Sequence, residues 1–217
     1  MFIEPMESRT LMSVSAISAQ VAADRAQVHA DLLKFQSDLV ANTGTIQADC
    51  AALQADDVKH DTTLAPLFKT LHADVKAMRS ALAADRLAES SAVLKDESVI
   101  VTALQQYASD AGNSTARKAD RKALLADHIQ LQNDEIAGLN ARLTTRQNAY
   151  GKIFADLSAI TTAADNETGL SAQVLADVTK FANDRTTCLN TLAGDLSTLV
   201  HDRTQLVTDL TAIESAT

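Results

Sequence analysis

The sequence has few of the residues that interrupt helices or build broad globular cores. Only six Gly and two Pro occur among its 217 residues, and it contains no Trp. A loop-rich or β-rich protein would need more turn residues, because Gly and Pro are the main residues of tight turns. Aromatic residues make up only 3% of the chain, although 46% of its residues are hydrophobic. The apolar side chains are therefore mainly small and aliphatic, which favours narrow, closely spaced helices.

Positive charge and long apolar runs are also scarce. The chain has 19 Lys and Arg against 28 Asp and Glu, which gives a net charge of −9. Nucleic-acid binding needs clustered basic residues that displace counterions from phosphates, so we expect no nucleic-acid partner. The richest apolar stretch, residues 99–101 with Leu104 close behind, is far shorter than the roughly 18 residues that span a bilayer. We expect no transmembrane segment, and binding to a membrane surface is not favoured.

The motifs of common enzyme classes are missing from the sequence. It has no P-loop, no G-x-S-x-G nucleophile elbow, no G-x-G-x-x-G turn and no H-E-x-x-H pair. Long aligned helices would also supply few loops on which to mount an active site. We therefore expect that the chain is not an enzyme, and we predict no catalytic residues and no cofactor.

Apolar residues recur in steps of three and four along most of the chain. This spacing keeps one stripe on one face of a helix, whereas a half-buried strand would alternate at every second residue. The first segment illustrates the pattern with Val14, Ile17, Val21, Val28, Leu32, Phe35 and Leu39. Three further segments show the same rhythm, so the sequence predicts an all-α protein.

Three breaks divide these stripes into four segments of similar length. Cap and turn residues gather at 61–63, just before Pro66, and again at 112–114 and 165–169. Short connections between equal helices predict an elongated up-down-up-down antiparallel four-helix bundle or coiled coil, with helices of about 45–50 residues. A split of the first helix at residues 42–44 is the chief alternative, and the equal lengths favour continuity. The expected helices are 14–60, 64–111, 115–164 and 168–215, within a single domain at 14–217.

Aspartate recurs along all four segments, mostly in steps of seven or eleven. Such mixed steps bring the mean repeat close to 3.6 residues per turn and predict nearly straight helices. Calcium needs several oxygens around one ion, but aspartates seven apart on one helix lie about 10 Å apart along its axis. A solvated flank that sets helix register through weak ion pairs is therefore favoured over calcium sites. The series are Asp24, Asp31, Asp38, Asp49, Asp56; Asp74, Asp85, Asp96; Asp120, Asp127, Asp134; and Asp177, Asp184, Asp195, Asp202, Asp209.

Three histidines on different predicted helices fall at one level of the antiparallel bundle. His29, His128 and His201 could hold a metal there together with Asp127 or Asp202. The E-x-x-H pairs typical of di-iron bundles are missing, however. We favour surface or boundary histidines and predict no metal site, while this level stays the candidate for a ligand- or metal-binding bundle.

Two cysteines, Cys50 and Cys188, fall on the apolar stripes, and neither belongs to a C-x-x-C pair. Equal antiparallel helices would leave them some 16 Å apart along the axis, at about 1.5 Å per residue. Bridged cysteines need Cα atoms within about 7 Å of one another. We therefore predict two buried free thiols.

The first residues differ in composition from the helical body. Phe2, Glu7, Arg9, Leu11 and Ser13 match the LEPR-XLL type motif of bacterial surface and secreted proteins, and this segment resembles it. Two methionines replace leucines of the motif, and a serine replaces its proline. The resemblance covers residues 2–13 only, and it implies a bacterial origin and export to the envelope or exterior. It implies no activity.

Three classes of function stay open from the sequence. A non-catalytic structural or protein-interaction bundle, with a protein partner or self-association, is favoured because the chain looks like a long scaffold. A bundle that holds a ligand or metal is the second class. A lipid-binding amphipathic bundle is the third, and it would need an apolar hairpin that the sequence does not contain.

Overall fold

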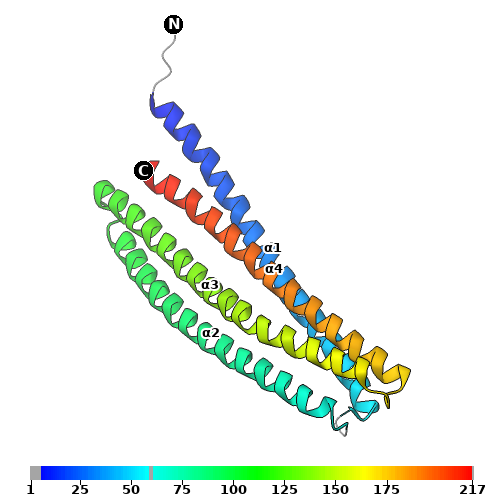
Figure 1. The fold of residues 1–217 in the computed structure, drawn as a ribbon. Helices are drawn as coiled ribbons and strands as arrows, with labels where there is room; N and C mark the ends of the chain where they lie inside the picture. Colours follow the sequence, from blue (N-terminus) through cyan, green and yellow to red (C-terminus); the bar gives the residue numbers. More distant parts are fainter. Residues whose placement is uncertain (1–5, 59–60, 217) are drawn as a thin grey trace. The chain divides into compact units, whose positions relative to one another are not determined.

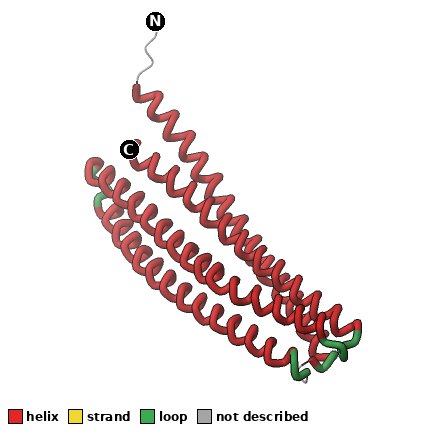
Figure 2. Tube along the Cα trace, in the orientation of Figure 1, coloured by secondary structure: helices red, strands yellow, loops and turns green. Residues whose placement is uncertain are grey.

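A computed structural model of the chain describes residues 6–58 and 61–216, with side chains from residue 17 onward. Over these residues it contains four α-helices and no strand (Figure 1; Figure 2). The predicted all-α four-helix fold is confirmed. None of the helices so described is long and apolar enough to cross a membrane. The helices are α1 (Met6–Ala55), α2 (Leu64–Ser109), α3 (Ser114–Asn166) and α4 (Ala172–Ala216).

The helix boundaries follow the predicted breaks, with shifts at the ends. α1 continues through Asn42, Thr43 and Gly44, so the alternative of a split first helix is wrong. It begins at Met6, eight residues before the predicted start, and it ends at Ala55 instead of residue 60. Asp57 has a φ of 58°, the left-handed conformation that commonly follows a helix end. This turn explains why α1 ends early in a loop that contains no glycine.

Side-chain caps fix the beginnings of the other three helices. Asp61, Asn113 and Ser171 each accept a hydrogen bond from the backbone N–H three residues later, at 2.7, 3.1 and 3.2 Å. Such caps satisfy donors that the first turn of a helix leaves free. Asp61 and Asn113 lie within the predicted breaks. Ser171 lies beyond the third predicted break, and α4 accordingly begins four residues later than expected.

Helix contacts group the chain into two units, each of which contains parts of all four helices. Unit 1 comprises residues 1–32, 85–140 and 198–217, and unit 2 comprises residues 33–84 and 141–197. The helix pairs in contact are α1 with α4, α2 with α3, and α3 with α4. The single domain expected at 14–217 and its near-straightness stay predictions.

Unit 2 contains the larger hydrophobic core, to which all four helices contribute. Ile153, Ile160 and Val178 are completely buried there, and the rings of Phe68 and Phe181 lie 5.7 Å apart between α2 and α4. The core forms because the apolar stripe of each helix faces the other helices, as the three- and four-residue spacing requires.

Unit 1 has a smaller core, built mainly between α1, α3 and α4. Val21, Leu206 and Leu210 are buried in it, and the partly buried Leu125 and Ile129 pack against them. On α2, several large apolar side chains of this unit stay exposed. The two units therefore differ in how much apolar surface they bury.

For two glycines of α3 we expect substitution by alanine to change the free energy of unfolding in opposite directions. A Cβ built on Gly138 would lie 2.5 Å from Cγ and 2.8 Å from Cβ of Glu89 on α2, whereas Gly151 has open space around it. We expect Gly151→Ala to raise the free energy of unfolding by about 1 kcal/mol, because alanine favours the helix. Gly138→Ala should lower it, because overpacking costs about 1–3 kcal/mol.

Urea unfolding followed by circular dichroism measures both changes. The two variants control for each other, since they share one helix and one substitution. Equal stabilisation by both would contradict the close approach of α2 and α3 at Gly138.

Candidate functional site

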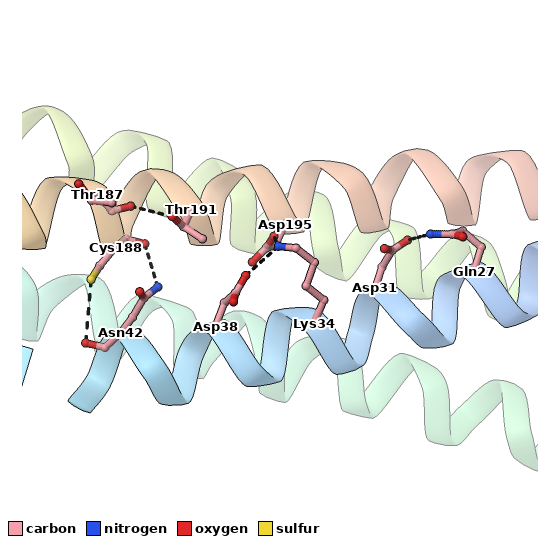
Figure 3. Close-up of polar contacts among 9 residues, drawn as sticks. All are labelled: Gln27, Asp31, Lys34, Asp38, Asn42, Thr187, Cys188, Thr191 and Asp195. Carbon is pink, nitrogen blue, oxygen red and sulfur yellow. Dashed lines mark hydrogen bonds and ion pairs between the residues drawn. The ribbon is translucent and has the colours of Figure 1, made fainter. Parts of the chain in front are cut away.

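Lysines and aspartates join α1 to α4 in unit 2. Lys34 on α1 donates a hydrogen bond to Asp38 at 2.7 Å and also pairs with Asp195 on α4 (Figure 3). The Asp195 side chain is only 9% exposed. Hydrogen bonding from Lys34 lowers the pKa of Asp38, and hydrogen bonds to Asp195 and Asp38 raise the pKa of Lys34. One ammonium group thus holds two carboxylates of different helices.

The same arrangement recurs further along the two helices. Lys180 on α4 donates to Asp184 at 2.7 Å and pairs with Asp49 on α1, whose side chain is 4% exposed. Because the α1 partner rises in number as the α4 partner falls, these two bridges show that α1 and α4 run antiparallel in this unit.

Elsewhere, aspartates of neighbouring helices, or of the residues just beyond a helix end, lie against one another. Two carboxyl groups in contact cannot both ionise freely, so a pair tends to keep one proton between them. In unit 1, one step of seven residues along α1 is matched by seven residues back along α4. The pairs are Asp56–Asp177 and Asp74–Asp156 in unit 2, and Asp24–Asp209, Asp31–Asp202, Asp96–Asp134 and Asp110–Asp120 in unit 1.

Asp96 on α2 shows how such a pair is built. It is 8% exposed, and its Oδ2 atom is buried without a hydrogen-bond partner in the described part of the chain. Burial is the main cause that raises the pKa of Asp96, followed by the neighbouring carboxyl group of Asp134. For Asp202 the contact with Asp31 is the main cause and burial the second. Asp96 and Asp202 therefore hold a proton more strongly than a free aspartate does.

These findings correct the expectation of a solvated aspartate flank. Asp24, Asp49, Asp96 and Asp195 are each 8% exposed or less. The physical reason is the narrow interface, because positions beside the apolar stripe of one helix reach the matching positions of its neighbour. A carboxyl group there meets either a lysine or another carboxyl group. No group of three or more metal-ligating side chains occurs among the residues described.

A donor four residues earlier holds one member of most pairs, and this signal is visible in the sequence. Gln130, for example, donates to Asp134 at 3.0 Å, whereas no such donor binds Asp96 opposite. In five of the six pairs at least one aspartate accepts such a bond, and in the pair of Asp24 and Asp209 both aspartates do. Sequence reasoning found the aspartate series but missed the Gln or Lys before it. The bonds are Gln20–Asp24, Gln27–Asp31, Lys34–Asp38, Gln106–Asp110, Gln130–Asp134, Gln173–Asp177, Lys180–Asp184 and Gln205–Asp209.

The three histidines of the proposed ligand level belong to unit 1 but do not share a site. His29 and His201 are exposed, and the partly buried His128 contacts the Leu124 carbonyl through Nδ1 at 2.7 Å. His128 and Arg203 both line a hollow of about 370 Å³, and His29 and His201 do not line it. The structure therefore does not bring His29, His128 and His201 together as a cluster that could hold a ligand.

Both cysteines are free thiols in the structure, but only one of them is buried. Cys188 is 7% exposed, and burial raises the pKa of its thiol. Cys50 is exposed, so the prediction of two buried thiols is wrong for this residue. The preceding Asp49 takes the buried position against Lys180, and Cys50 next to it stays accessible to solvent.

Comparison of the chain with protein-family models, with curated proteins and with solved structures finds no match of any kind.

The aspartate pairs predict that the protein becomes more stable as the solution is acidified from neutral pH. A carboxyl group whose pKa is raised in the folded state binds more protons there than in the unfolded chain. The free energy of unfolding therefore rises as pH falls through the raised pKa, and the gain is complete below the ordinary aspartate value of about 4. Asp38, whose pKa is lowered, acts oppositely and loses its contribution only at lower pH.

Two asparagine substitutions separate these effects. Asp96→Asn imitates the protonated acid and should raise the free energy of unfolding at neutral pH while weakening its pH dependence. Asp38→Asn removes a partner of Lys34 and should lower stability at neutral pH. Urea unfolding between pH 4 and 8 measures the pH dependence for wild type and Asp96→Asn, and at pH 7 it measures the loss of stability in Asp38→Asn. A wild-type protein whose stability rises with pH across this range would rule out proton sharing.

Proposed function

We propose that this chain is a non-catalytic structural or protein-interaction helical bundle of the bacterial envelope or exterior. The observation that carries the proposal is the recurrence of one contact, an aspartate that meets a lysine or a second aspartate on the adjacent helix. It occurs in both units and in both the α1–α4 and α2–α3 pairs. A binding or catalytic site concentrates different groups at one place.

Aspartate contacts that recur at a fixed spacing are suited to keeping long helices in register. Exposed ion pairs each contribute little to stability, but polar groups repeated along an interface penalise any shifted alignment. A shift of α4 by one residue against α1 would separate Lys180 from Asp49 and Lys34 from Asp195 together. This specificity supports a rigid structural role for helices of 45 to 53 residues.

The proposed location rests on the N-terminal resemblance to the LEPR-XLL type motif. Residues 2–5 of the matching segment lie outside the described residues, and residues 6–13 form the first turns of α1. The motif supports export from a bacterial cell, and the helical body adds nothing to this inference.

Fractionation of cells that express the chain with a C-terminal tag tests the location. We expect the protein in the envelope fraction or the medium, and we expect Arg9→Ala to reduce export. Thr10→Ala is the matched control, because Thr10 lies in the same segment but does not match the motif. Retention of the wild-type protein inside the cell would remove the location from the proposal.

An exposed row of apolar side chains on α2 supports the protein-interaction part. Leu87, Leu94 and Val101 follow one another at seven-residue steps in unit 1, and they are 74%, 65% and 53% exposed. Seven-residue apolar spacing is the repeat by which two helices pack as a coiled coil. A second copy of this chain carries the same repeat on its own α2, so self-association through this row is the form of interaction that we propose.

Sedimentation velocity of the purified protein tests self-association. We expect a dimer that Leu94→Glu converts to a monomer, because a charge at the centre of the row would be buried on pairing. Val40→Glu on α1 is the control, since Val40 is equally apolar and 74% exposed but lies outside the row. A wild-type monomer at all concentrations would contradict the proposal.

A further inference from the structure

Unit 2 contains a hollow that the structural role proposed above does not use. It lies between α1, α2 and α4 and has a volume of about 580 Å³. A smaller hollow of about 280 Å³ shares Cys50, Gln54, Phe68 and Phe181 with it. Small-molecule sites in proteins usually measure about 300–1,000 Å³. The hollow is therefore large enough for a ligand of modest size.

Apolar side chains form a large part of the wall of the hollow, beside Gln47, Gln54 and His72. Leu71 and Val75 of α2 and Phe181 of α4 are buried residues that line it, and Phe68 and Ile46 complete the apolar part. Apolar walls of this kind suit a hydrocarbon chain or ring, because contact with them removes apolar ligand surface from water.

Three guanidinium groups gather where this apolar part ends. Arg79 of α2 and Arg185 of α4 line the hollow, and each lies one or two helical turns beyond the apolar residues of its own helix. Arg185 interacts electrostatically with Arg79 and with Tyr150. Arg146, which is 5% exposed, donates to the Tyr150 hydroxyl at 3.5 Å. The Tyr150 hydroxyl in turn donates to the Leu189 carbonyl at 2.8 Å, so it does not supply negative charge.

These arginines have no carboxylate partner in the part of the chain that the structure describes. The Nε atoms of Arg146 and Arg185 are buried without a hydrogen-bond acceptor. Burial, followed by the charge of Arg79, lowers the pKa of Arg185. By contrast, Lys34 and Lys180 in the same unit each bind two aspartates. Arg146 is buried and Arg185 is half-buried, and positive charge without a counterion is costly in such surroundings. The chain has 28 acidic residues, yet none of them pairs with these arginines in the part that the structure describes.

We propose that unit 2 binds a small amphipathic anion, with its acidic head between Arg79 and Arg185 and its apolar tail along Phe68 and Phe181. Guanidinium groups bind carboxylate and phosphate oxygens through paired hydrogen bonds, which would satisfy the donors that now lack acceptors. A head group alone would leave the apolar walls uncovered. A neutral lipid would leave the guanidinium charges unpaired.

Calorimetric titration with decanoate below its micelle-forming concentration tests this proposal. Acetate supplies the head without the chain, and decyltrimethylammonium supplies the chain with the opposite charge. We expect saturable binding of decanoate, a higher Tm in its presence, and neither effect with the other two compounds. Binding of the cation as strong as that of decanoate, or no binding of decanoate, would overturn the proposal.

Arginine substitutions test the position of the head group. Arg185→Gln and Arg79→Gln should each weaken decanoate binding by about tenfold or more, because each removes a charged hydrogen-bond donor. Arg86→Gln is the matched control, since Arg86 is an exposed arginine of α2 outside the hollow. Because Arg79 is also exposed, its variant keeps the test decisive if Arg185→Gln fails to fold. Unchanged affinity in the Arg79 variant would overturn the assignment.

The two thiols give a second, independent measurement. Cys50 lines the hollow, whereas Cys188 is buried and outside it. Bound decanoate should slow the alkylation of Cys50 by iodoacetamide several-fold and leave Cys188 unaffected, as peptide mass spectrometry can report. Equal protection of both thiols would indicate general tightening of the bundle, and it would overturn the assigned place of the ligand.

Discussion

Two carboxyl groups that meet at a helix interface repel one another when both are ionised, and this constraint governs how the four helices are joined. The protein satisfies this constraint in two ways. A lysine brings one ammonium group to two aspartates, as Lys34 and Lys180 do between α1 and α4. Where no lysine intervenes, two aspartates face each other, as Asp96 and Asp134 do between α2 and α3, and burial followed by the Asp134 carboxyl group raises the pKa of Asp96. Both solutions tie together residues that are far apart in sequence.

The polar contacts and the hydrophobic core have different tasks in this fold. Burial of leucine, isoleucine and valine drives the helices together, but such side chains tolerate many alignments of one helix against another. The aspartate contacts are specific, because a carboxyl group without its lysine or its proton-sharing partner would be buried and charged. This division explains why a net-acidic chain places acidic residues such as Asp49 in its interior. The guanidinium groups of Arg79, Arg146 and Arg185 differ from Lys34 and Lys180 of the same unit, each of which binds two aspartates.

Local sequence signals were sufficient to predict the four helices and to recognise one aspartate in most of the contacting pairs. The steps of three and four predicted all four helices, and the caps Asp61 and Asn113 lay within predicted breaks. The Gln or Lys four residues before an aspartate is equally local, and it could have been recognised as a supported carboxylate. The opposite aspartate could not be identified, because its partner depends on the alignment of two helices. The three histidines expected at one level of the bundle do not share a site for the same reason. The faces on which they lie decide whether residues at one height meet.

Helix formation, the places where the helices break and the excess of acidic residues could all be predicted from the amino-acid order. These properties depend on spacings within one helix, where residues three or four apart always share a face. Three other properties follow from the tertiary structure alone. They are the burial of particular aspartates, the exposure of Cys50 beside the buried Asp49, and the proximity of Arg79, Arg146 and Arg185. Those outcomes depend on the alignment of neighbouring helices, which the packing of side chains from all of them sets jointly.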